Sequence, residues 1–154
     1  MIRLYHLLCG ACMMLMATLC SAVQPDDRVI YFAGGCFWGV EEYFSRIPGV
    51  IDVAVGYTNG KTEDPSYEDI CSQKTGHAET ARVVYAPHIV SLRILARQFF
   101  KIIDPVSVGR QGHDAGSQYR TGMYYASDDD KPVLESVLDE ERKKHRQTWH
   151  RGSG

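Results

Sequence analysis

One cysteine stands between glycines and aromatic residues in the run Gly34-Gly35-Cys36-Phe37-Trp38-Gly39. The residues from Val29 to Ala33 before it are apolar and rich in β-formers, and the apolar residues after it recur at intervals of three and four. This pattern predicts a strand, a turn and then a helix that begins at or just after Cys36. A helix N-terminus stabilises the thiolate, which is the nucleophilic form of cysteine. The sequence therefore predicts a reactive thiol.

Two other interpretations of this run are open. A lone cysteine is often a small buried hydrophobic residue, and glycines between a strand and a helix can bind a phosphate. However, Phe37 and Trp38 would obstruct the close approach of a phosphate, and the run matches neither glycine-loop fingerprint. The context favours a thiol nucleophile.

Several regular elements would position this thiol. Alternating or continuous apolar residues predict four strands, at 29–33, 51–57, 81–85 and 122–126. Helical spacing predicts one helix from Phe37 to just before Pro48, a second after the N-cap Ser91 that stops at Asp104-Pro105, and a charged helix after Pro132. The order β-α-β-β-α-β followed by a helix favours an α+β fold, a ferredoxin-like two-layer sandwich, over a doubly wound parallel sheet.

Two long polar loops separate these elements, one between Tyr57 and Ala81 and one from Val106 to Thr121. Loops of this length without secondary structure are uncommon in a compact domain unless they form a site. We therefore expect them to supply the polar residues of the site.

The bulk composition limits the class of protein. The chain has 154 residues, of which 44% are hydrophobic and 23% charged, so it is long enough for one domain with a core but not for two. Its formal net charge is only -2, so charge gives no sign of nucleic-acid binding. A small molecule or a peptide fits better as the substrate.

Residues 1–22 have the composition of a secretory signal peptide, with one early arginine, an apolar run and small residues at the end. The apolar run is too short for the roughly 20 residues of a membrane-spanning helix, so a membrane anchor is less favoured than export to the periplasm or the cell exterior. Lipid attachment at Cys12 or Cys20 is a further alternative. We expect a polar lead-in at 23–27 and one domain at 28–154.

Cysteine usage follows from that division. Cys9, Cys12 and Cys20 lie in the leader, so the mature chain would keep Cys36 and Cys71. Two cysteines and scattered histidines show no metal-ligand spacing, so no metal site is predicted.

Further motifs follow the cysteine in order: Gly56-Tyr57-Thr58, Pro65-Ser66-Tyr67, Gly76-His77-Ala78-Glu79 and the run from Arg110 to Arg120. Together with the Gly-Cys-Phe-Trp-Gly run, they resemble the signatures of the type A peptide methionine sulfoxide reductases. The resemblance covers roughly residues 28 to 146.

This resemblance implies a role for each site residue. Cys36 would attack the sulfoxide sulfur, Glu79 would protonate the leaving oxygen, Tyr67 and Tyr119 would hydrogen-bond that oxygen, and Asp114 would organise the polar side. An acid must stay protonated near neutral pH for this chemistry, and burial raises a carboxyl pKa in that sense. Phe37 and Trp38 would form an apolar pocket for the methyl group. The family also implies the S epimer of the sulfoxide.

Without the family, each of these residues has an ordinary interpretation. Glu79 would be a solvent-facing charge beside a strand, Asp114 a turn residue, and the tyrosines amphipathic residues with hydrated hydroxyls. Phe37 and Trp38 would be core residues. His77 and His113 are assigned no catalytic role and are expected in substrate contact or loop packing.

Turnover would leave Cys36 as a sulfenic acid that must be reduced. The resemblance implies no bound cofactor and an external thiol, thioredoxin or a similar dithiol. Family members often carry a resolving cysteine in a C-terminal tail, whereas this sequence has none after Cys71 and ends earlier than the family pattern. Apolar burial beside Ile70 is the expected state of Cys71, with pairing to Cys36 as the alternative. We expect a monomer.

Two rival functions remain at this point. A cysteine hydrolase would use Cys36 with His77 or His113 as the base, and it requires a histidine at hydrogen-bond distance from the sulfur. A binding remnant without catalysis would bind sulfoxide peptides, and the short C-terminus motivates it.

Overall fold

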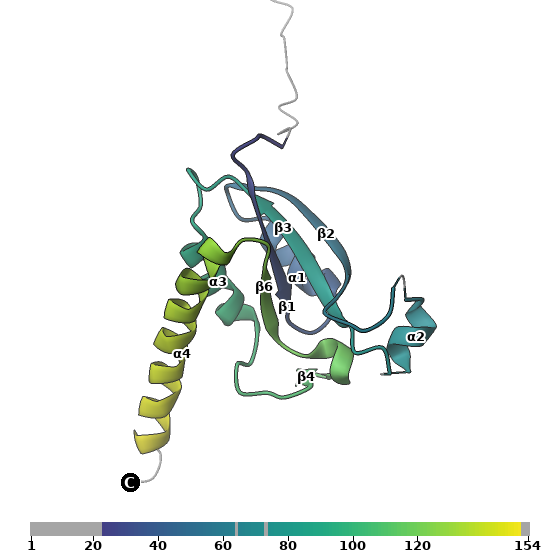
Figure 1. Ribbon diagram of the computed structural model, residues 1–154. Coiled ribbons are helices and arrows are strands. Elements are labelled where there is room, and N and C mark those ends of the chain that lie inside the picture. Colours follow the sequence, from purple (N-terminus) through teal and green to yellow (C-terminus); the bar gives the residue numbers. More distant parts are fainter. Residues whose placement is uncertain (1–22, 64, 73, 152–154) are drawn as a thin grey trace, which may run out of the picture.

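The computed structural model describes residues 23–63, 65–72 and 74–151, without the side chains of Cys71 and of 146–151. The expected signal peptide, residues 1–22, lies outside the described residues. One four-stranded sheet runs through the molecule (Figure 1). Its strands are β1 (Arg28–Ala33), β2 (Val50–Thr58), β3 (Ala78–Tyr85) and β6 (Gly122–Tyr125), in the order β2-β3-β1-β6, and each neighbouring pair is antiparallel.

Two helices, α1 (Phe37–Ser45) and α3 (Leu92–Ile102), pack against the same face of this sheet. The ring of Phe32, from β1, stacks on Phe44 of α1 at a centroid distance of 4.6 Å and on Phe99 of α3 at 4.8 Å. All three rings are fully buried. Burial of a side chain of this kind stabilises the fold by about 1.5–3 kcal/mol, so this stack fixes both helices on the sheet.

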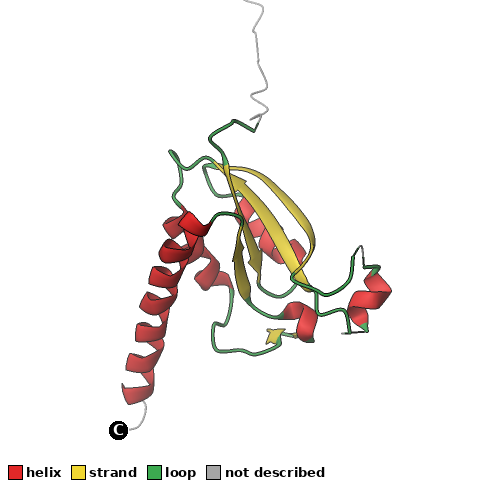
Figure 2. Ribbon diagram, in the orientation of Figure 1, coloured by secondary structure: helices red, strands yellow, loops and turns green. Residues whose placement is uncertain are grey.

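The long helix α4 (Lys131–Arg151) flanks α3 and runs away from the sheet at the left of Figures 1 and 2. Leu134 and Val137 are its buried apolar residues against the core. Glu140 adds a polar connection, since Arg93 donates to it at 2.8 Å and Arg97 at 2.9 Å. Apolar contact and two arginines together hold α4 against α3.

Short elements occupy the loops that the sequence left without structure. The helix α2 (Tyr67–Cys71) lies between β2 and β3 and projects at the right of Figure 1. The strands β4 (Arg110–Gln111) and β5 (Asp114–Ala115) form a hairpin, and the 3-10 helices are η1 (Ser117–Tyr119) and η2 (Asp128–Asp130).

The structure confirms a mixed α/β fold with an antiparallel sheet, and the predicted order β-α-β-β-α-β is seen in β1, α1, β2, β3, α3 and β6. Ser91 caps α3 as predicted, because its side chain accepts a hydrogen bond from the Ile94 N–H. Several boundaries differ by one residue, and two differ by more. The first helix ends at Ser45 rather than just before Pro48, and β3 begins at Ala78 rather than Ala81.

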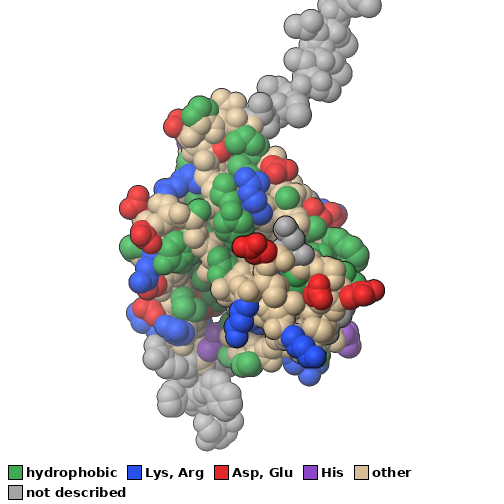
Figure 3. Space-filling view, turned by 45° about the vertical axis from the view of Figure 1, so that its right-hand side comes forward, with side chains coloured by type: hydrophobic (Ala, Val, Ile, Leu, Met, Phe, Trp, Pro, Cys, Tyr) green, Lys and Arg blue, Asp and Glu red, His purple; other side chains and the backbone are tan. Residues whose placement is uncertain are grey.

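On the face shown in Figure 3, cationic and anionic side chains are interspersed. This agrees with the near-neutral net charge. Within the described part of the chain, no helix is long and apolar enough to cross a membrane.

Candidate active site

Cys36 is the N-cap residue of α1, as the sequence predicts. Its carbonyl accepts hydrogen bonds from the N–H groups of Gly39 at 3.1 Å and Val40 at 3.4 Å. The side chain is half-buried and forms no disulfide. The preceding Gly35 has φ +85°, a left-handed conformation that glycine adopts without a steric penalty. The turn therefore places a free thiol at the positive end of the α1 dipole.

Glu79 lies on β3, on the face that carries Ala81 and Val83 beneath the helices. Its Oε2 atom accepts a hydrogen bond from the N–H of Phe37, the residue after the cysteine, at 3.1 Å. Only 4% of Glu79 is exposed, so the interpretation as a solvent-facing charge is wrong. Because β3 begins at Ala78, Glu79 lies within the strand and its side chain points to the same face as Ala81 and Val83.

Two effects raise the pKa of Glu79 and one lowers it. Burial raises the pKa most, because it disfavours the charged carboxylate. The hydrogen bond from Phe37 lowers it, and the negative charge of Asp114 raises it again. The net result is a pKa above the usual range for glutamate, in the direction that a proton donor at neutral pH requires.

Asp114, whose charge acts on this acid, lies on the β4–β5 hairpin, where it pairs with Gln111. Asp114 is half-buried and lies in the two-residue strand β5, just after the turn. The interpretation of Asp114 as a turn residue is therefore wrong. Gly116 closes the base of the hairpin by donating to the carbonyl of Gly109 at 2.9 Å. The following helix η1, which ends at Tyr119, packs against β3.

The aromatic residues extend outward from the thiol. The ring of Phe37 lies 5.7 Å, centroid to centroid, from both Trp38 and Tyr57. Trp38 is 67% exposed, which contradicts core packing for this residue. An exposed apolar surface next to a thiol is available to bind a ligand.

Tyr67 and Tyr119 lie on separate segments. Tyr67 is the first residue of α2 and is 64% exposed, whereas Tyr119 is half-buried at the end of η1. A capping box begins α2, since Ser66 Oγ accepts from the Asp69 N–H and the Ser66 N–H donates to Asp69. A hydrogen bond from Phe37 and the charge of Asp114 both act on Glu79, so these three residues form one site beside Cys36.

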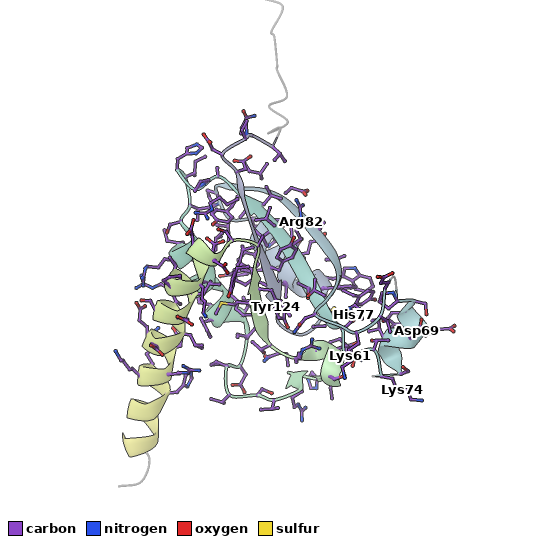
Figure 4. The ribbon with its side chains drawn as sticks, viewed as in Figure 1. Lys61, Asp69, Lys74, His77, Arg82 and Tyr124 are labelled. Carbon is purple, nitrogen blue, oxygen red and sulfur yellow. The ribbon has the colours of Figure 1, made fainter. Side chains whose placement is uncertain are left out.

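The two histidines are placed differently. The Nε2 atom of His77 lies 2.9 Å from the Thr62 carbonyl, and the ring packs so closely over Gly60 that a Cβ there would overlap it. Figure 4 shows His77 where β3 meets the loop of α2. His77 thus packs a loop, as the sequence allowed, and its hydrogen bond is not to the Cys36 sulfur. His113 is exposed in the β4–β5 turn.

A separate groove of about 750 Å³ lies between α4, β6 and the segment 105–109. Apolar residues such as Phe100, Met123 and Leu138 line it, and none of the predicted site residues does. Among the described residues, no group of three or more His, Cys, Asp or Glu side chains could hold a metal ion.

One residue of the site escaped the sequence reasoning. Gln111 hydrogen-bonds to three groups on two other segments and packs on Gly35. Its only sequence signal is its position beside Gly112 in the run that ends at Arg120.

Comparison with known proteins gives a consistent answer. A family model described as peptide methionine sulfoxide reductase matches residues 28–151. The peptide methionine sulfoxide reductase MsrA of Clostridium acetobutylicum is 49% identical over 118 residues, which are 77% of this chain and 73% of that protein. The protein of the same name from Clostridium perfringens is 54% identical over 111 residues, covering 72% of this chain and 69% of that protein.

Solved structures agree with these relatives. Methionine sulfoxide reductase A of Corynebacterium diphtheriae superposes with a TM-score of 0.76 at 33% identity, over 85% of this chain and 62% of that chain. Mxr1 from Saccharomyces cerevisiae in reduced form superposes with a TM-score of 0.75 at 36% identity, over 80% of this chain and 73% of that chain. The same yeast protein is also similar in its complex with Trx2, with a TM-score of 0.58 at 30% identity over 80% of this chain and 72% of that chain. With a free thiol and a buried acid at one helix start, the chain belongs to the peptide methionine sulfoxide reductase family.

Proposed function

We propose that the chain reduces the S epimer of methionine sulfoxide, free or in peptides and proteins, with Cys36 as the nucleophile and Glu79 as the acid. The family makes the chain an oxidoreductase that acts on methionine sulfoxide. The observation that carries the assignment of residues is the 3.1 Å hydrogen bond from the Phe37 N–H to Glu79 Oε2. This bond holds a buried carboxyl group beside the nucleophile.

The first step follows from this geometry. The Cys36 thiolate attacks the sulfoxide sulfur and forms an S–S bond while the S–O bond breaks, and the oxygen takes a proton from Glu79 and leaves as hydroxide. Because Glu79 Oε2 accepts the Phe37 N–H, a proton on Oε1 is free to move to the substrate oxygen. The hydroxide then attacks the Cys36 sulfur and breaks the S–S bond, and the bonding electron pair goes to the substrate sulfur. Cys36 is left as a sulfenic acid that carries the oxygen, and the substrate is left as the thioether.

The other site residues take supporting roles. Tyr67 and Tyr119 donate hydrogen bonds to the sulfoxide oxygen, and the negative charge of Asp114 adds to burial in raising the pKa of Glu79. Phe37 and the exposed Trp38 contact the methyl group and so favour methionine over more polar sulfoxides.

Recycling of Cys36 then needs two thiols. One thiol displaces water from the sulfenic acid to give a mixed disulfide, and a second thiol releases Cys36 and leaves as the oxidised disulfide. We assign this reduction of the sulfenic acid to an external thioredoxin-like dithiol, with no bound cofactor. The likeness to Mxr1 in complex with Trx2 supports this assignment. Cys71, whose side chain lies outside the described residues, is given no part in it.

Three further proposals complete the function. Residues 1–22 are a cleaved leader that exports the enzyme to the periplasm or the cell exterior, and the enzyme acts as a monomer. The strand order β2-β3-β1-β6, with both crossover helices on one face, supports a ferredoxin-like layout. N-terminal sequencing of the protein from fractionated cells, with its mass in solution, tests the first two.

The enzyme assay is single-turnover conversion of the separate S and R epimers of a methionine sulfoxide peptide, with and without dithiothreitol. One equivalent of methionine from the S epimer without reductant, and many with it, is the expected result. Cys36→Ser should give none. Conversion of ester or amide substrates without a reductant would instead favour the hydrolase, and binding without conversion by a folded chain would favour the remnant.

A further inference from the structure

The side chain of Gln111 forms hydrogen bonds with two segments outside its own hairpin. Its Oε1 accepts from the Asp104 N–H at 2.7 Å, and its Nε2 donates to the Asp104 carbonyl at 2.8 Å. The same Nε2 donates to Thr121 Oγ1, also at 2.8 Å. The amide thereby ties the hairpin both to the end of α3 and to the start of β6. Because the contacts use both amide N–H groups and the carbonyl oxygen, they fix its orientation.

The stem of the same side chain lies against the turn of the nucleophile. A Cβ placed on Gly35 would come within 2.8 Å of the Gln111 Cβ and 3.5 Å of its Cγ. Real Cβ atoms do not approach that closely. Gln111 is therefore packed directly on the residue that precedes Cys36, and only a glycine fits beneath it.

The backbone of Gln111 completes the connection to the acid. Gln111 pairs with Asp114 across β4 and β5, and the charge of Asp114 acts on Glu79. Glu79 in turn accepts the N–H of Phe37. A closed circuit of hydrogen bonding, charge, strand pairing and packing thus runs from the cysteine turn through Glu79 and Asp114 to Gln111, and back to Gly35.

We propose that Gln111 is a positioning residue for the reaction, whose side chain holds the β4–β5 hairpin, and with it Asp114, against the turn that carries Cys36. This inference rests on the proposed function, because it concerns the distance between Asp114 and the acid of that reaction. Gln111 itself contacts neither the sulfur nor the acid in the described hydrogen bonds.

Other charged or titratable groups at this end of β3 do not replace Asp114. Tyr57 stands opposite Glu79 on β2, Tyr119 lies on η1, and Cys36 lies at the start of α1. Arg120 is held by the carbonyls of Ser117 and Asn59. Of these side chains, Asp114 is the one whose charge raises the pKa of Glu79. Moving it away must lower that pKa and shift the high-pH limit of activity toward lower pH.

The test compares the full chain with Gln111→Ala, Asp114→Asn and the double variant, in single-turnover reduction of a methionine sulfoxide peptide across pH. Gln111→Ala should slow the reaction about ten- to a hundredfold. It should also move the high-pH limb in the same direction as Asp114→Asn. In the double variant the limb should lie where Asp114→Asn alone places it, because Gln111 acts through Asp114.

The matched control is Gln98→Ala on α3, where the glutamine accepts a hydrogen bond from Tyr43 at 2.7 Å and belongs to no part of this circuit. It should leave the pH profile in place. A Gln111→Ala profile that keeps its high-pH limb while the thermal midpoint falls would reduce Gln111 to a structural residue and overturn the inference. An additional shift in the double variant would overturn it too.

Thr121→Val serves if Gln111→Ala does not fold, because it removes only one of the three bonds and keeps the shape of the side chain. It should produce a smaller shift of the same sign, and an unmoved limb would contradict the proposal. An unmodified chain that reduces no sulfoxide would instead disprove the proposed function, so the two failures are distinguishable.

Discussion

Two regions near Cys36 are held by different forces: the apolar layer of Phe32, Phe44 and Phe99, and the polar segments around the β4–β5 hairpin. In the apolar layer, Phe32 stacks between Phe44 and Phe99, and all three side chains are completely buried. In the polar segments, the β4–β5 hairpin and its neighbours are attached by hydrogen bonds from side chains to main-chain groups, such as Gln111 to Asp104 and Arg120 to Asn59. The layer holds the body of α1 and α3 on the sheet, and the polar segments hold Asp114 where its charge acts on Glu79.

The energies of the two regions differ accordingly. Burial of a large apolar side chain contributes about 1.5–3 kcal/mol to the free energy of unfolding, whereas a typical hydrogen bond contributes a net of about 0.5–1.5 kcal/mol. Stability should therefore depend mainly on the aromatic layer. Activity should depend mainly on the polar segments, since small displacements there move Asp114 relative to Glu79.

The strongest test of this division is Glu79→Gln. It removes the proton donor, so the reduction rate should fall by about 10²–10⁴-fold. Stability should move the other way. Because the pKa of Glu79 is raised in the folded state, ionisation costs stability as pH rises from the usual glutamate range through the raised value. The variant has no such loss, so it should melt no lower than the parent at mildly alkaline pH.

The control for Glu79→Gln is Glu135→Gln on the exposed side of α4, where the glutamate pairs with Lys131 at 3.8 Å. It should change neither rate nor melting. A Glu79→Gln protein that keeps more than a tenth of the parent rate would remove Glu79 from the reaction.

Phe44→Ala tests the apolar layer. Removal of a buried phenylalanine ring should cost about 3–5 kcal/mol of unfolding free energy, measured by denaturant titration. The rate per folded molecule should stay within about threefold of the parent, because Phe44 touches no site residue in the described ring contacts. A large loss of rate in the folded fraction would mean that the layer and the site are not separable.

Gly35→Ala acts on the boundary between the two regions. The new methyl group would meet Gln111 Cβ at 2.8 Å, in a backbone with φ +85°. Gly109→Ala is the matched control, because its φ of +62° is also left-handed but its Cβ would meet nothing within 4 Å. The control should lose about 1 kcal/mol of stability for the backbone strain alone.

Gly35→Ala should lose about 1–3 kcal/mol more than that control, together with a lower reduction rate. Equal losses in the two variants would show that the contact with Gln111 is unimportant.

Sequence patterns predicted the elements that pack by periodicity. The aromatic layer is visible in the spacing of Val40 and Phe44, and the cap at Ser91 is visible as a residue type. Cys36 was predicted at the start of its helix for the same reason. These features depend on residues close together in the chain.

The start of β3 was missed because Ala78, Glu79 and Thr80 are all buried. A strand covered on both faces loses the alternation that marks a half-exposed strand. The helix α2 was missed because it is five residues long and has one buried apolar side chain, Ile70, among its described ones. Too few residues remain to show a period.

The polar connections were out of reach for a different reason. Gln111 bonds to a residue seven positions before it and to another ten positions after it, so no local pattern records them. The motifs named Glu79 and Asp114 through family resemblance, but their mutual effect depends on burial and distance. Their assigned roles remain predictions until the variants are assayed.

The smallest expected effect lies farthest from the thiol, at the polar contact between α3 and α4. The pKa of Glu140 is lowered, chiefly by the hydrogen bond from Arg97 and further by Arg93. A lowered pKa in the folded state gives stability at neutral pH that is lost as pH falls through the lowered value. Glu140→Gln should therefore melt slightly below the parent near neutral pH, and the two melting temperatures should converge in acid. Because both arginine contacts are partly exposed, the difference should be small. The reduction rate should not change, since none of these side chains contacts the circuit around Cys36. A slower reaction in Glu140→Gln would show that α4 influences the site, and the separation of the two regions would then fail.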